Sequence, residues 1–117
     1  LYVPIGSGPH GALVITAGVH PVDKREPVIV RLADGLARTG LYILQVQSDA
    51  LMADRIEPDE PGNLVAAFQR LRAEPNVDPR RIGGLGLSTG GDVLIEVAAE
   101  QRGLRAVVAD GASAFQW

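Results

Sequence analysis

The sequence IGGLGLSTGG at residues 82–91 decides the fold of this chain. Its first part is a short apolar run, which is typical of a strand buried on both faces. The pattern that follows predicts an amphipathic helix from 89 to about 102. Strand and helix therefore meet at Ser88, in a turn so tight that small residues are needed two positions before and after it. Gly86 and Gly90 satisfy that need.

Further strands and helices alternate on both sides of this turn. Apolar runs predict buried strands at 12–17 and 41–46 and a further strand at 104–109. Amphipathic patterns predict helices at 27–39 and from about 59 or 61 to 73. Strands that alternate with helices favour right-handed crossovers and a parallel sheet with helices on both faces. We therefore predict an α/β fold with three layers, made of about four strands and three helices.

Periodicity also predicts which side of each helix is buried. In the helix at 27–39, Val28 and Ile29 begin the apolar face that we expect to pack on the sheet. In the helix after Ser88, the charged residues recur every four positions, which predicts a solvent-exposed stripe. That stripe consists of Asp92, Glu96 and Glu100.

Composition excludes several classes of protein. The chain has 117 residues, 46% of them hydrophobic and 21% charged, with a net charge of −3. The basic residues are dispersed, so we expect no nucleic-acid partner. There is no cysteine and there are only two histidines, so we expect neither a metal site nor a cofactor. No apolar run is long enough to span a membrane. We expect a cytoplasmic protein with no second domain in this stretch.

The turn at Ser88 has the features of a nucleophile site. A residue at the apex of such a turn is forced into a strained conformation, and its side chain projects from the carboxyl edge of the sheet. The Ser88 hydroxyl would lie at the start of the next helix, and the N–H of Thr89 would point to the same place. An oxyanion forming on a substrate carbonyl would be stabilised there by that N–H and by the helix dipole.

With these features the chain resembles the α/β-hydrolase family, in particular its bacterial dienelactone-hydrolase-like and serine-peptidase-like branch. Residues 77–83 before the turn and 104–112 after it are similar to the runs that such proteins carry there. The resemblance implies that Ser88 is the nucleophile of a serine esterase or related acyl hydrolase and that Thr89 supplies one oxyanion-hole N–H. Val19 would supply the second, although Ala17 stands where the family has histidine. The glycines of the turn would be Gly86, Gly90 and Gly91.

The catalytic base is missing from this stretch. The family order is serine, then an acid, then a histidine, but His10 and His20 both precede Ser88. Asp110, after the last predicted strand, could be the acid, and His20 could be an unusual base. We therefore expect residues 1–117 to be the N-terminal and central part of a single α/β-hydrolase domain, inactive by itself. An exposed sheet edge would then associate with the rest of the domain or with a second copy.

Two other interpretations of the same residues are also possible. Gly84, Gly86 and Gly90 follow a strand, and Asp110 ends the next one, which imitates the fingerprint of a dinucleotide-binding module. The chain could also be a non-catalytic protein of the hydrolase fold that binds a ligand or partner. The hydrolase interpretation predicts a small-molecule acyl substrate, whereas the dinucleotide interpretation predicts NAD or NADP.

Overall fold

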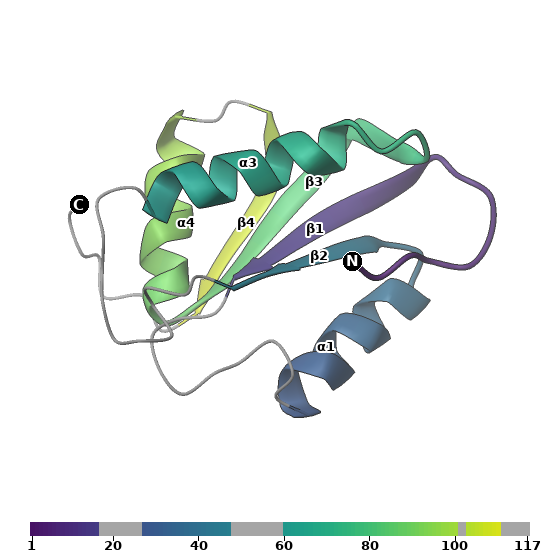
Figure 1. Ribbon diagram of the computed structural model, residues 1–117, viewed down its shortest axis with the longest axis horizontal. Coiled ribbons are helices and arrows are strands. Elements are labelled where there is room, and N and C mark those ends of the chain that lie inside the picture. Colours follow the sequence, from purple (N-terminus) through teal and green to yellow (C-terminus); the bar gives the residue numbers. More distant parts are fainter. Residues whose placement is uncertain (17–26, 48–59, 101–102, 111–117) are drawn as a thin grey trace.

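The computed structural model describes residues 1–16, 27–47, 60–100 and 103–110. They form one sheet of four parallel strands in the order β2-β1-β3-β4. The strands and helices alternate along the chain as predicted (Figure 1). The strands are β1 (His10–Thr16), β2 (Tyr42–Val46), β3 (Val77–Leu87) and β4 (Leu104–Asp110), and the helices are α1 (Pro27–Arg38), α3 (Glu60–Arg72) and α4 (Thr89–Glu100).

The helices lie on both faces of the sheet. On one face α3 and α4 pack together over the strands, and their Phe68, Leu71 and Leu94 are fully buried in a cluster that includes Val14 of β1. On the other face α1 packs its alanines over β1 and β2, in a smaller cluster around Ile15. Burial of large aliphatic side chains on both sides is what holds a parallel sheet together.

The buried face of α1 is narrower than predicted. Ile29, Ala33 and Ala37 form the buried row at i, i+4 and i+8. Val28 lies just outside this row and is 59% exposed, so its predicted burial is wrong. On the outer side of the helix, Arg38 donates a hydrogen bond to Asp34.

Strand β3 begins at Val77, earlier than the predicted start at residue 82, and it includes Pro79. Proline cannot donate to a β-ladder, so it is tolerated where the pairing is irregular. The register shifts here: His10 of β1 is opposite Val77, but Ala12 is already opposite Ile82. The irregular segment at 78–81 therefore admits the proline. No helix among the described residues is long and apolar enough to cross a membrane.

Gly35 in α1 offers a first test of the fold. A Cβ atom at this position would meet nothing within 4 Å, and the residue is exposed. Glycine in a helix interior costs roughly 0.5–1 kcal/mol relative to alanine, because its backbone loses more freedom on folding. We expect Gly35→Ala to increase the free energy of unfolding by about that amount, measured by urea denaturation followed by circular dichroism. A decrease would contradict the exposed position of Gly35 in α1.

Candidate active site at the turn between β3 and α4

Ser88 is the single residue between β3 and α4, and its backbone is strained. Its φ angle is 54°, in the left-handed region that side-chain-bearing residues rarely adopt. Among the described residues other than glycine it is the only one with a positive φ. The residue is exposed, so the strain does not serve to bury its side chain. Such strain persists only where the surrounding structure enforces it, and it clusters at functional sites.

Close contact between β3 and the start of α4 enforces this conformation. A Cβ atom on Gly86 would lie 2.6 Å from Cα of Gly91 and 2.7 Å from the carbonyl oxygen of Gly90. Any larger residue at position 86 would therefore push the first turn of α4 away from the strand. Gly90 and Gly91 are themselves buried in this contact. The packing of the turn therefore requires glycine at position 86.

Hydrogen bonds tie Ser88 to both neighbouring elements. Its carbonyl oxygen accepts from the N–H of Gly91 at 2.8 Å and from that of Asp92 at 3.4 Å, which starts α4. Its own N–H donates to the carbonyl oxygen of Asp110 at 2.7 Å, at the end of β4. Thr89 follows as the first residue of α4, where backbone N–H groups lack partners within the helix. The hydroxyl-bearing residue is therefore held beside a helix N-terminus.

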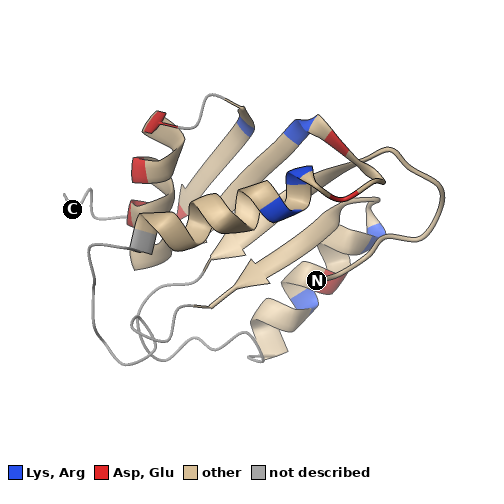
Figure 2. Cartoon of the chain, turned by 45° about the horizontal axis from the view of Figure 1, so that its top comes forward, with Lys and Arg blue, Asp and Glu red and all other residues tan. Residues whose placement is uncertain are grey.

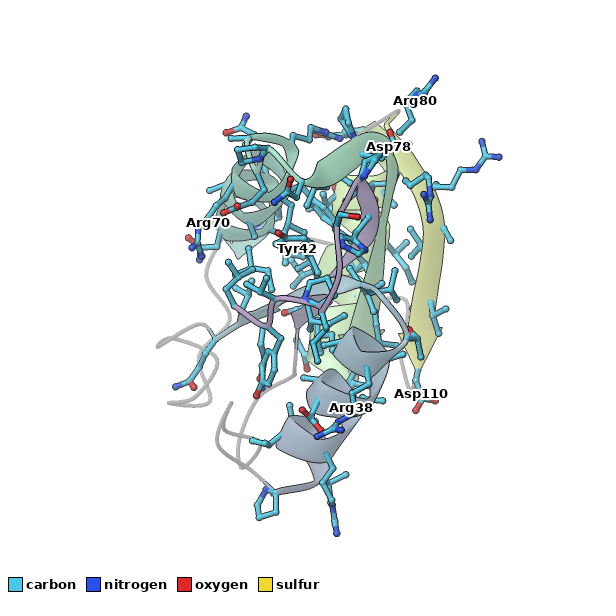
Figure 3. All side chains as sticks on the ribbon, turned by 90° about the vertical axis from the view of Figure 1, so that its right-hand side faces the viewer. Arg38, Tyr42, Arg70, Asp78, Arg80 and Asp110 are labelled. Atoms are coloured by element: carbon cyan, nitrogen blue, oxygen red, sulfur yellow. The ribbon has the colours of Figure 1, made fainter. Side chains whose placement is uncertain are left out.

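The site lies at the carboxyl edge of the sheet. Leu87 is paired with Asp110, and Gly86 with Thr16, so β1, β3 and β4 all end near Ser88. The side chain of Asp110 is exposed at this end of β4 (Figure 3). The described structure thus brings Ser88, Thr89, the three glycines and Asp110 to the same end of the sheet. Val19 and His20 lie outside the described residues.

His10 lies at the opposite edge of the sheet from Ser88. It is the first residue of β1, and its ring packs against Tyr42 with the ring centroids 5.8 Å apart. Its Nε2 lies 3.3 Å from the carbonyl oxygen of Gly6. These contacts give His10 a structural role at the amino ends of the strands.

The burial of Asp92 contradicts one prediction about α4. It was expected in a solvent-exposed stripe, but it is only 4% exposed. In the same stripe, Glu100 is exposed and Glu96 is half-buried. Asp92 comes one helical turn after Ser88, in the first turn of α4, where the helix dipole favours a negative charge. A carboxylate in the first turn of a helix is visible in the sequence, but its burial depends on packing that periodicity does not report.

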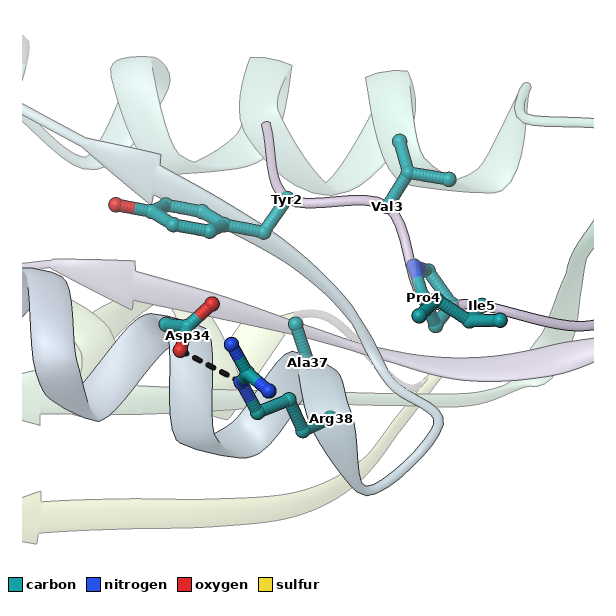
Figure 4. A pocket seen from close by; sticks show the side chains of 7 residues that line it. All are labelled: Tyr2, Val3, Pro4, Ile5, Asp34, Ala37 and Arg38. Atoms are coloured by element: carbon teal, nitrogen blue, oxygen red, sulfur yellow. Dashed lines mark hydrogen bonds and ion pairs between the residues drawn. The ribbon is translucent and has the colours of Figure 1, made fainter.

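A hollow of about 430 Å³ lies away from this site, between the N-terminal segment and α1 (Figure 4). The Tyr2 backbone pairs with Ile43 of β2 and holds the segment there. On α1, the Asp34 carboxylate accepts a 2.8 Å hydrogen bond from Arg38, and this contact raises the pKa of the guanidinium. Both charged groups are largely exposed. This hollow shares no residue with the turn at Ser88.

No protein-family model and no curated protein matches the chain. Several solved structures do. An alpha/beta hydrolase, GrgF from Penicillium sp. sh18, is 20% identical with a TM-score of 0.73, and the match covers 91% of this chain and 38% of GrgF. Est1E from Butyrivibrio proteoclasticus is 21% identical with a TM-score of 0.74, and the match covers 90% of this chain and 41% of Est1E. The 2,6-dihydroxy-pseudo-oxynicotine hydrolase is 21% identical with a TM-score of 0.74, and the match covers 87% of this chain and 29% of that hydrolase.

These matches agree with the alternation of strands and helices and with the parallel sheet. The chain spans well under half the length of each of these proteins. At such low identity the likeness concerns the fold, which the sequence resemblance had implied. The described strands and helices are those of a partial α/β-hydrolase fold.

Proposed function

We propose that the chain carries the nucleophile of a serine hydrolase, which cleaves an ester, thioester or amide through an acyl-enzyme. The observation that supports this most directly is the φ of 54° at Ser88, on an exposed residue between a strand and a helix. The fold alone would be satisfied by glycine at this position, which adopts a positive φ without strain. A strained serine at the carboxyl edge of a parallel sheet is what a nucleophile at a tight turn requires.

In the proposed reaction Ser88 Oγ attacks the substrate carbonyl carbon, and the carbonyl electron pair moves onto the oxygen. The N–H groups of Thr89 and Val19 would stabilise that oxyanion, assisted by the dipole of α4. Collapse of the intermediate expels the leaving group, and water then releases the acid. The serine proton needs a base, and the sequence has no histidine after Ser88.

We infer that residues 1–117 are the N-terminal and central part of one hydrolase domain, with the base outside them. Asp110 is a candidate for the acid, because its backbone already contacts Ser88 and its side chain is exposed at the same edge. The solved structures with the same fold support the class of reaction, since their names describe hydrolases. Est1E and GrgF are both more than twice as long as the segment of each that matches this chain.

A fluorophosphonate probe tests the proposed role of Ser88. With imidazole added as an external base, we expect the probe to phosphonylate Ser88 Oγ with loss of fluoride, located by peptide mass spectrometry. Ser88→Ala should remove the labelled peptide. Ser7→Ala is the matched control, because Ser7 is exposed in the N-terminal segment and should not affect labelling. A chain that stays unlabelled, or labels equally after Ser88→Ala, would contradict the proposal.

Packing at Gly86 also bears on the dinucleotide alternative. In a dinucleotide-binding turn, a glycine lets the backbone approach the pyrophosphate. Here the position of a Gly86 side chain is already filled by backbone atoms of Gly90 and Gly91. We therefore expect no binding when the chain is titrated with NAD or NADP by calorimetry. Saturable binding that is lost on Asp110→Ala would favour the nucleotide module instead.

A further inference from the structure

Charged residues are segregated between the two ends of β3 and β4. Arg80, Arg81 and Arg105 lie near the amino ends of these strands and are exposed, and Figure 2 shows basic residues at this end of the sheet. Asp110 lies at the carboxyl end beside Ser88, and Figure 3 shows it far from Arg80. Neither α4 nor the last four residues of any described strand contain lysine or arginine. The described residues next to Ser88 therefore carry no positive side chain.

The side chain of Asp110 faces the side of the sheet opposite to α4. Gly86 faces α4, because a Cβ atom on it would contact the start of that helix. Successive residues of a strand point to opposite faces, so Leu87 faces away from α4. Asp110 is paired with Leu87 in the parallel register and faces the same way as Leu87. Its carboxylate is thus kept away from the N-terminus of α4, where we propose that the oxyanion forms.

The carboxylate of Asp110 is close to Ser88 and accessible. The backbone carbonyl oxygen of Asp110 accepts the Ser88 N–H at 2.7 Å, and adjacent strands are only roughly 5 Å apart. The side chain is exposed, and within residues 1–16, 27–47, 60–100 and 103–110 it takes part in no ion pair. A cationic group of a molecule bound at Ser88 could therefore approach this carboxylate directly.

We propose that the substrate attacked by Ser88 carries an ammonium group and that Asp110 binds it. This inference rests on the proposed function of Ser88. The substrate would lie across the carboxyl edge of the sheet, with its carbonyl oxygen turned toward the Thr89 N–H and its ammonium group on the opposite side, beside Asp110. A carboxylate on the α4 side would repel the oxyanion, whereas one on the far side attracts a cation without opposing the reaction. Asp110 would then determine specificity for esters, thioesters or amides that bear an ammonium group.

Two fluorophosphonate probes of equal chain length test this specificity on the 117-residue chain. One ends in a trimethylammonium group and the other in a tert-butyl group, which has nearly the same shape but no charge. Imidazole is present at a pH where it is neutral, and it takes the Ser88 proton as the phosphorus–oxygen bond forms and fluoride leaves. We expect the cationic probe to label Ser88 about three- to tenfold faster at low salt, because attraction to an exposed carboxylate is only partly screened. The ratio of the two rates should approach one in about 1 M sodium chloride.

Asp110→Asn tests the contact, and Glu100→Gln is its matched control. Each variant removes one exposed carboxylate, but Glu100 lies at the other end of α4 from Ser88. We expect Asp110→Asn to bring the ratio of the two rates close to one and Asp110→Lys to invert it, while Glu100→Gln keeps the ratio of the parent chain. Circular dichroism checks that each variant is folded.

The ratio of rates separates specificity from any other role of Asp110. If Asp110→Asn slowed both probes equally, Asp110 would act on the reaction itself, and the proposal would be overturned. Equal labelling of the parent chain by the two probes would also overturn it, but would leave the role of Ser88 intact. Absence of labelling by both probes would overturn the ammonium proposal together with the proposed function.

Discussion

Gly86→Ala is expected to lower the free energy of unfolding by about 3 kcal/mol, at the upper end of what overpacking costs. The added Cβ atom would lie within 2.6–2.8 Å of three backbone atoms of Gly90 and Gly91. Backbone atoms cannot rotate away, so the start of α4 must move and the hydrogen bonds at Ser88 must stretch. Urea denaturation followed by circular dichroism measures the loss. The same variant should also lose probe labelling at Ser88.

Two other glycines provide graded controls for this prediction. A Cβ atom on Gly84 would come within 2.7 Å of a methyl group of Leu94, which is the end of a flexible side chain. Gly84→Ala should therefore destabilise the protein less than Gly86→Ala does. A Cβ atom on Gly35 would meet nothing within 4 Å, so Gly35→Ala should stabilise the protein. If the three substitutions had equal effects, the close contact between β3 and α4 would not be what determines the stability of the turn.

Much of this fold could be predicted from the sequence because local patterns report it directly. Glycines flank Ser88 at the spacing of a tight strand-to-helix turn, and the turn forms with the strain that this spacing implies. Alternation of apolar runs with amphipathic segments indicated the parallel sheet, since parallel strands need crossover helices between them. The position of Asp110 followed from the same topology, because it ends the strand next to the turn.

Other features depend on packing between distant elements, which periodicity does not report. Asp92 was expected in solvent because charged residues recur along one helical stripe, yet the start of α4 is pressed against the sheet. Val28 was expected inside, but only one row of α1 reaches the sheet. The sequence analysis placed the start of β3 too late because proline, here Pro79, usually interrupts a strand. The irregular register that accommodates Pro79 cannot be seen in one sequence.

The exposure of most of β4 belongs with these features. The sequence indicates that both strands are apolar, which is the pattern of strands buried on both sides. Which side is covered depends on where the crossover helices pass. Both α3 and α4 pass on the same side, and on the other side the cluster under α1 includes residues of β1 and β2 and Leu85 of β3, but none of β4. The exposure of Val108 is therefore a consequence of topology, and it becomes visible only when the strand order is known.

Imidazole is expected to restore a base to the chain and to accelerate phosphonylation of Ser88 by roughly tenfold or more. A positioned general base contributes ~10²–10⁴-fold, and a diffusing one gives less because it must be captured in the right orientation. Neutral imidazole accepts the proton from Ser88 Oγ as the new phosphorus–oxygen bond forms and fluoride leaves. Only the neutral form can do so. The gain should therefore rise with pH through the pKa of imidazole and level off above it.

The measurement is the initial rate of Ser88 labelling against imidazole concentration at several pH values, with Ser88→Ala as the blank for direct attack by imidazole. His20→Gln separates the two possible sources of a base, because His20 precedes Ser88 in the chain. If His20 already acted as the base, labelling without imidazole would be fast and this variant would slow it. If the base is absent from the 117 residues, the variant should label as the parent does and show the same gain. A rate that does not respond to imidazole, with Ser88 unlabelled throughout, would mean that the strained turn holds an inert serine.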